Sequence, residues 1–177
     1  MIVKDGEFKQ ARIEKIAEAM CLAARTAPKA RGLDLLEVIV IKGKEDIAEL
    51  SKKMLNIGQQ QEHKTFLRDG ENILKAAAIV IIGTRRQALQ LKYCGLCGYA
   101  DCAANDKAGG MCAFNPGDLG IAIGSAVSVA MDNRLDNRIM YTVGKAAIEL
   151  GWLGPKVKLA YGIPLSATGK NPFFDRK

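Results

Sequence analysis

Residues 76–83 read AAAIVIIG, a continuous apolar run that a glycine closes. Residues 35–41 read LLEVIVI and form a second run, in which Glu37 is the one charged residue. Strands that are apolar on both sides, and do not alternate, are typical of a sheet that helices cover on both faces. We therefore expect these two runs to be buried strands of a layered domain.

Helical spacing flanks both runs. Apolar residues recur every three or four positions over residues 13–27 and again over residues 47–57, and Pro28 follows the first of these stretches. Both stretches are therefore predicted to be amphipathic helices. The polar residues 59–70 are expected to form a loop, after which a short helix could begin near Asn72.

The last third of the chain is expected to add two helices and a strand. Asp118 can serve as the N-cap of a helix that is apolar nearly all round. Asp136 or Asn137 can cap a further helix, and a strand over residues 156–161 then precedes a Gly- and Pro-rich tail over residues 162–177. This order of elements indicates an α/β or α+β domain, with a layered sheet and flanking helices.

The length and composition fit one domain. The chain has 177 residues, of which 49% are hydrophobic and 25% charged, which is enough for a hydrophobic core. We expect a single domain over residues 1–177, with residues 84–117 inserted in it as a cysteine-rich loop.

Several classes of function are disfavoured by what the sequence lacks. The net charge of +7 is scattered, and no aromatic residues are interleaved with basic ones, so no nucleic-acid partner is expected. The longest uncharged stretch, residues 119–131, is shorter than the roughly 18 residues of a membrane span. No secretory signal is visible, so the expected location is the cytoplasm. His63 is the single histidine and is expected to be a solvated side chain.

Four of the five cysteines are crowded into one window. Cys94, Cys97, Cys102 and Cys112 have the spacing C-x2-C-x4-C-x9-C. Thiols this close in sequence do not readily form unstrained disulfides, so metal ligation is the better interpretation. Zinc sites usually join two separated ligand pairs, whereas successive cysteines from one loop are typical of an iron–sulfur cluster. The spacing favours four-iron ligation, and zinc remains the alternative.

Small residues around these cysteines agree with a cluster. Gly95, Gly98, Gly109 and Gly110 allow the backbone to fold tightly and to direct N–H groups at sulfide. Cys21 stands apart in the first predicted helix, where a buried structural thiol is expected.

A resemblance to a known family can be named at this loop. Residues 94–104, CGLCGYADCAA, resemble the start of the four-cysteine iron–sulfur domain of electron-transfer and corrinoid proteins, C-G-x-C-G-x-x-x-C, which carries a 4Fe–4S cluster. The departure is Cys112, which comes sooner here than the fourth ligand of that domain. The whole chain is similar to an uncharacterised prokaryotic family described as containing a ferredoxin-like domain, a description that implies no particular reaction.

A second, weaker resemblance concerns the frame of the protein. Residues 23–28, AARTAP, followed by the strand over 37–41, resemble the flavin-dependent nitroreductases, in which a helix ends in A-P-S before the first strand. Residues 118–131 resemble the central apolar helix of that fold, and residues 161–164, YGIP, with Lys170, resemble its closing G-Y-P and basic tail. The resemblance implies a nitroreductase-like fold, a homodimer and a possible FMN site between the subunits.

The sequence also departs from the nitroreductase pattern. The N-terminal Arg-Arg-Ser that grips the FMN phosphate in that family is absent. A phosphate could still meet Arg25, Lys29, Arg31 or Lys170, which carry the charge such a group needs. The competing interpretation is that all four are solvated surface cations.

These features together predict a cytoplasmic iron–sulfur oxidoreductase, with a flavin linked to a 4Fe–4S cluster and a small-molecule substrate. An electron-carrier protein is the expected partner, because the basic surface could steer an acidic one towards it. The alternatives are a non-enzymatic electron carrier, a redox sensor, or a binding protein held together by zinc.

Overall fold

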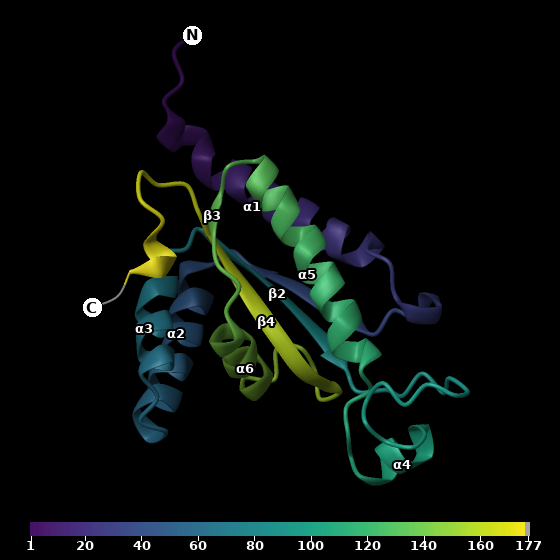
Figure 1. Cartoon of the computed structure of the whole chain (residues 1–177). Coiled ribbons are helices and arrows are strands. Elements are labelled where there is room, and N and C mark those ends of the chain that lie inside the picture. Colours follow the sequence, from purple (N-terminus) through teal and green to yellow (C-terminus); the bar gives the residue numbers. More distant parts are fainter. Residues whose placement is uncertain (176–177) are drawn as a thin grey trace.

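The computed structural model describes residues 1–175 and is built around a four-stranded antiparallel sheet with the strand order β1-β2-β4-β3 (Figure 1). The strands are β1 (Leu36–Ile41), β2 (Ala78–Arg85), β3 (Asp136–Asn137) and β4 (Val157–Ser166). Both strands expected from the apolar runs are therefore present. Every residue of β2 before Arg85 is buried, as expected for a central strand. In β1 only Leu36 and Ile41 are fully buried, because this strand lies at the edge of the sheet.

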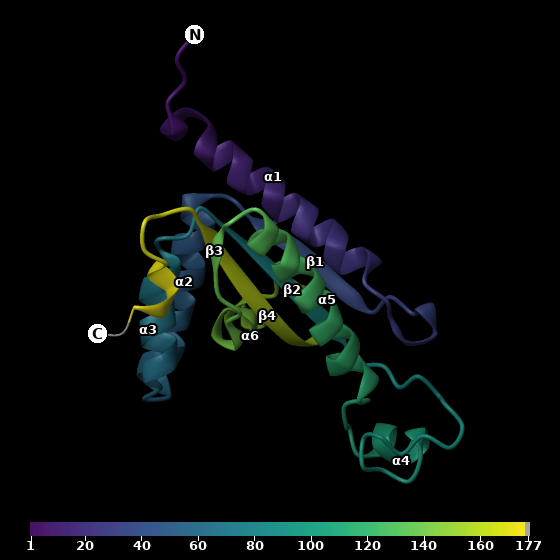
Figure 2. The ribbon, with the colours of Figure 1, turned by 45° about the horizontal axis from the view of Figure 1, so that its top comes forward.

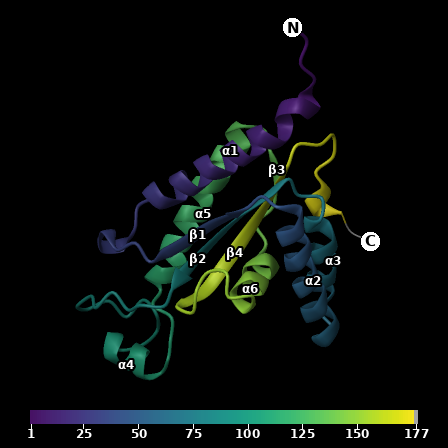
Figure 3. The same cartoon turned by 180° about the vertical axis from the view of Figure 1, so that it is seen from behind.

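Helices cover both faces of the sheet, as the apolar runs predicted. On one face lie α1 (Asp5–Thr26) and α5 (Phe114–Asp132), and on the other lie α2 (Lys44–Gln60), α3 (Lys64–Ile73) and α6 (Tyr141–Glu149), as Figures 1 and 3 show. Alternate residues of β2 serve the two cores. Val80 and Ile82 pack with α1 and α5, whereas Ile79 and Ile81 pack with α2, α3 and α6. The two apolar cores therefore share one strand.

The polar segment over residues 59–70 is not a loop. It holds the turn after α2 and most of α3, which packs against α2. Phe66 and Ile73 are buried on the inner face of α3, but so are the polar side chains of Asp69 and Asn72. Asp69 accepts a hydrogen bond from the Thr142 hydroxyl at 2.7 Å, which offsets part of the cost of its burial. Because polar residues share the buried face of this helix, its sequence lacks the apolar spacing that predicts an amphipathic helix.

Three element boundaries near the C-terminus also differ from expectation. Asp118 is not an N-cap: α5 begins four residues earlier, at Phe114, and the Asp118 carboxylate accepts the Ala30 N–H at 3.1 Å. Asp136 and Asn137 form β3 instead of capping a helix, because they pair with the end of β4. Consequently α6 begins only at Tyr141. The strand β4 runs on to Ser166 and so includes the first five residues of the expected tail over 162–177, whose residues 176–177 lie outside the described part.

The helix α6 packs closely on β4 at two glycines. A Cβ atom on Gly144 would overlap the Ala160 carbonyl, and one on Gly162 would overlap the side chain of Val143. Both glycines let the helix backbone approach β4 more closely than larger residues would. Along residues 1–175 there is no helix both long and apolar enough to cross a membrane.

Candidate functional site

The four clustered cysteines lie in the segment between β2 and α5, which contains only the short helix α4 (Cys102–Lys107). Figures 1 and 2 show this segment extending beyond the end of the sheet, next to the start of α5 and away from α2 and α3. Its backbone turns sharply at Gly95 (φ +63°) and Gly98 (φ +82°), and the Gly98 N–H donates to the Gly95 carbonyl at 2.9 Å. Asp101 then accepts the Ala104 N–H at 2.7 Å and so begins α4 at Cys102.

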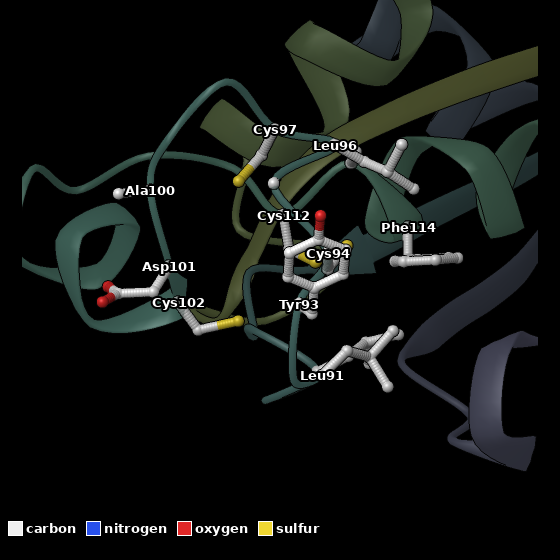
Figure 4. Close-up of a pocket in the computed structure, with 13 residues that line it drawn as sticks. Leu91, Tyr93, Cys94, Leu96, Cys97, Ala100, Asp101, Cys102, Cys112 and Phe114 are labelled. Carbon is white, nitrogen blue, oxygen red and sulfur yellow. The ribbon is translucent and has the colours of Figure 1, made fainter.

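All four thiols line a single pocket. Figure 4 shows the side chains of Cys94, Cys97, Cys102 and Cys112 around it, and its volume is about 40 Å³. Cys112 is buried, Cys97 and Cys102 are half-buried, and Cys94 is exposed, so the pocket opens to solvent on the Cys94 side. All are free thiols. The rest of the lining is largely apolar and includes Leu89, Leu91, Leu96 and Phe114.

The four thiols give this pocket a donor set of the kind that iron–sulfur clusters use. Among residues 1–175, no three His, Cys, Asp or Glu side chains gather closely enough to hold a single metal ion. One zinc ion would require its four sulfurs to lie about 3.8 Å apart, given tetrahedral Zn–S bonds of about 2.3 Å. A four-iron cluster accepts a wider set of thiolates, because each sulfur binds a different iron. Four thiols around an apolar pocket therefore fit a cluster.

The ends of the cysteine segment are fastened by residues that the sequence analysis missed. The side-chain amide of Asn115, only 1% exposed, accepts the Gln87 N–H at 3.1 Å and donates to the Gln87 carbonyl at 3.0 Å. Leu89 and Cys112 pack with Leu35 in a small core of their own. The signal that could have revealed this anchor is an asparagine three residues after the last cysteine, at the start of an apolar helix.

Three of the four cations expected at a phosphate belong to the last turn of α1 and the residues just after it, and each has a partner of its own. Arg25 donates to Asp34 at 2.6 Å and to the Leu36 carbonyl at 3.0 Å. Lys29 donates to three carbonyls at the end of α1, at 2.7–3.1 Å. Arg31 donates to the Leu89 carbonyl at 2.8 Å and so contacts the cysteine segment.

The fourth expected cation lies elsewhere in the chain. Lys170 follows β4 and is paired with Asp175 at 2.6 Å. This segment lies at the opposite end of the sheet from the cysteines (Figure 1). Within one chain, Lys170 is therefore not part of the same group as Arg25, Lys29 and Arg31.

A second pocket adjoins the cysteine pocket on the side of α1. It measures about 480 Å³, and its lining includes Lys29, Asp118 and Ile121. Leu96, Ala113 and Phe114 line both pockets and form the wall between them. A group bound in the second pocket would therefore be separated from the thiols by the thickness of a few side chains.

The two remaining residues of chemical interest lie away from the cysteine pocket. Cys21 is half-buried on α1, and burial is the main reason that the pKa of its thiol is raised to about 11. The expectation of a buried structural thiol at this position is therefore only partly met. His63 is exposed, as expected, but its Nε2 lies 3.2 Å from the Tyr141 hydroxyl.

Comparison with known structures confirms the nitroreductase-like frame. An FMN-bound nitroreductase from Desulfitobacterium hafniense DCB-2 superimposes with a TM-score of 0.63 and 17% identity, over 89% of this chain and 79% of that one. A BluB-like flavoprotein from Clostridium difficile 630 superimposes with a TM-score of 0.60 and 19% identity, over 100% of this chain and 84% of that one. At these identities the likeness establishes the fold alone.

Sequence comparison identifies the family. An uncharacterized protein of Archaeoglobus fulgidus is 38% identical over 99% of this chain and 98% of its own length. Residues 108–176 match the family described as "uncharacterized protein containing a ferredoxin domain" (DUF2148). This range includes Cys112 but not the other three clustered cysteines. The chain thus belongs to this ferredoxin-domain family and has the fold of the flavin-dependent nitroreductases.

Proposed function

We propose that this chain is an iron–sulfur redox protein in which residues 86–113, between β2 and α5, are an inserted cluster-binding loop that is shorter at both ends than the expected residues 84–117. Cys94, Cys97, Cys102 and Cys112 would hold a 4Fe–4S cluster, which supplies one-electron transfer. The observation that carries the proposal is that all four thiols line one apolar pocket at the end of a nitroreductase-like sheet. Membership of a ferredoxin-domain family supports it independently.

The chain's own residues would give this site its character. With a cysteine for each iron, no coordination position is left open for substrate, so the site suits electron relay better than bond-making chemistry. Cys112, at 8% exposure, anchors the inner side of the pocket. Cys94 is exposed, so electrons would enter or leave on its side. Leu89, Leu91 and Phe114 would keep water from the inner wall.

The second pocket would hold FMN, which would make the protein a flavin-linked oxidoreductase. Its aromatic and aliphatic lining, Phe114 and Ile121, suits one face of a planar ring, and Arg31 and Lys29 lie at the same end of α1 for a phosphate. Flavin chemistry, when the group is bound, links two-electron reactions of a small substrate to single-electron steps. The side chains of Leu96 and Phe114, which line both pockets, would then lie between the flavin and the thiols.

The flavin site would be completed by a second copy of the chain. The outer faces of α1 and α5 expose Leu22, Ile121 and Met131 at 68%, 49% and 55%. Gly120 and Gly124 of α5 have nothing within 4 Å of an added Cβ, so another helix could approach closely there. Because Ile121 lines the second pocket and also belongs to this exposed face, a homodimer through α5 would close the pocket.

Anaerobic purification tests the cluster and the flavin separately. A brown protein whose broad visible absorption bleaches with dithionite, and which contains about four irons per chain, would support the cluster. Structured yellow absorbance that heat releases would support FMN. A colourless protein with bound zinc would overturn both redox assignments.

The variant Cys97→Ala should lose iron and colour, whereas the control Cys21→Ala should keep both, since Cys21 lies on α1 outside the pocket. Circular dichroism would distinguish loss of the cluster from loss of the fold. Unchanged iron content in a folded Cys97→Ala protein would contradict its assignment as a ligand.

A further inference from the structure

A cavity that shares no lining residue with the cysteine pocket lies on the face of the sheet covered by α2, α3 and α6. Its volume is about 590 Å³, which is within the range of small-molecule sites. The end of α2, the start of α3, α6 and the first residues of β4 enclose it. The residues that give it chemical character are His63, Phe66, Tyr141, Lys145, Glu149 and Lys158.

One wall of this cavity is a fixed aromatic cluster. Phe66 is 5% exposed and packs edge-on against His63 and Tyr141, with ring centroids 5.4 and 5.8 Å away and interplanar angles of 79° and 88°. The Tyr141 hydroxyl and the His63 Nε2 are 3.2 Å apart, within hydrogen-bond distance. The buried phenylalanine and this hydrogen bond hold two exposed rings in place, so the wall is ready to receive a flat apolar ligand.

The lining of the same cavity carries surplus positive charge. Its one carboxylate, Glu149, lies 3.0 Å from the Lys53 ammonium and 3.5 Å from that of Lys145. The hydrogen bond from Lys53 is the main reason that the pKa of Glu149 is lowered. The Glu149 carboxylate therefore stays ionised, and the positive charge of Lys53 balances it. Lys158 donates to the Pro155 carbonyl at 3.1 Å, and across residues 1–175 no carboxylate pairs with it.

We propose that this cavity binds a small aromatic carboxylate. The ring would lie against His63 and Tyr141, and the carboxylate would accept from Lys158, with Lys145 close by on α6. An aromatic carboxylate suits both the aromatic and the basic residues of the lining. Its ring can make edge-to-face contacts with other aromatic rings, and its carboxylate binds most strongly to an ammonium group that lacks an anionic partner. The site does not depend on the cysteine pocket, so it stands even if no cluster is bound.

Because His63 is the single histidine, its imidazole proton resonances report on the cavity without ambiguity. Titration of the full chain with benzoate should shift these resonances saturably. Cyclohexanecarboxylate keeps the charge without the aromatic ring, and benzamide keeps the aromatic ring without the charge. Each should bind at least roughly tenfold more weakly than benzoate. No saturable shift with benzoate, or equal binding of cyclohexanecarboxylate, would overturn the proposal.

A pair of lysine variants tests the anion contact by calorimetry. Lys158→Gln should weaken benzoate binding by roughly tenfold. Lys156→Gln removes the same charge two residues away, on a side chain outside the lining, and should leave the affinity unchanged. Equal affinities for the two variants would show that Lys158 does not receive the carboxylate. Both side chains are exposed, so neither variant should alter the fold.

Discussion

The side chain of Asn115 makes two hydrogen bonds to the backbone of Gln87, at 3.1 and 3.0 Å. These bonds join the end of the cysteine segment to its beginning. It is the first turn of α5 that presents this amide, three residues after Cys112. The last cysteine and the exit from β2 are thus held together by one buried polar side chain. Any group bound by the four thiols would rely on this clasp to keep the segment closed.

We expect Asn115→Leu to destabilise the protein by about 2 kcal/mol, because it removes both hydrogen bonds that the buried Asn115 amide makes with the backbone of Gln87. Iron content after anaerobic purification should fall with it. Thermal melting and iron analysis measure the two effects. The control Asn133→Leu removes an exposed amide that donates to the Val129 carbonyl, and it should change neither strongly. A fully stable Asn115→Leu protein would show that the segment is held by other contacts.

Cys21 should react with iodoacetamide much more slowly than Cys94 in cluster-free protein at neutral pH. Burial raises the pKa of its thiol to about 11, so only about one molecule in ten thousand carries the reactive thiolate at pH 7. Cys94 is exposed and should be modified early. A time course followed by peptide mass spectrometry measures the order. In urea the difference should vanish, and persistence of the difference there would contradict an origin in burial.

Asp34 should stabilise the fold at neutral pH but not in acid. Burial raises the pKa of its carboxyl, but the hydrogen bonds from Arg25 and the Leu36 N–H outweigh it, so the net pKa lies below the ordinary 3.8. The charged form is therefore favoured by folding, and its contribution is present above the unfolded pKa and lost as the pH falls through the folded one.

The free energies of unfolding of wild type and Asp34→Asn should accordingly differ at pH 6–8 by a constant amount, which is modest because the pair is partly exposed. The difference should shrink as the pH falls below about 4. Urea titrations across this range measure it. A difference that grows in acid would have the wrong sign for a lowered pKa.

Gly144→Ala should destabilise the protein by at least about 2 kcal/mol, because the new methyl group would overlap the Ala160 carbonyl of β4 and force α6 away from the sheet. Urea denaturation measures the loss. Gly6→Ala is a matched control in α1, where nothing lies within 4 Å of the added carbon, and it should be neutral or slightly stabilising. Equal stability of the two variants would mean that α6 can shift without cost.

Much of the frame could be predicted because its signals are local. The apolar run ending at Ile82 can only be accommodated between two layers, and Val80 and Ile81 indeed serve opposite cores. Likewise, the spacing from Cys94 to Cys102 confines those thiols to one turn-rich segment, whatever the rest of the chain does. Both inferences follow from chain connectivity and side-chain chemistry, and neither requires a partner from elsewhere in the sequence.

Other features were decided only by contacts between distant residues. Asp69 can lie on the buried face of α3 because it accepts a hydrogen bond from the Thr142 hydroxyl, 73 positions away. Asp118 accepts a hydrogen bond from the Ala30 N–H and does not cap a helix. No local sequence pattern predicts this contact either. Sequence alone specified which residues carry the sulfur, the charge and the apolar surface. Only the tertiary structure decided that Phe114 would stand between the thiols and a second pocket, and that His63 would meet Tyr141, because such meetings depend on how helices cross a sheet.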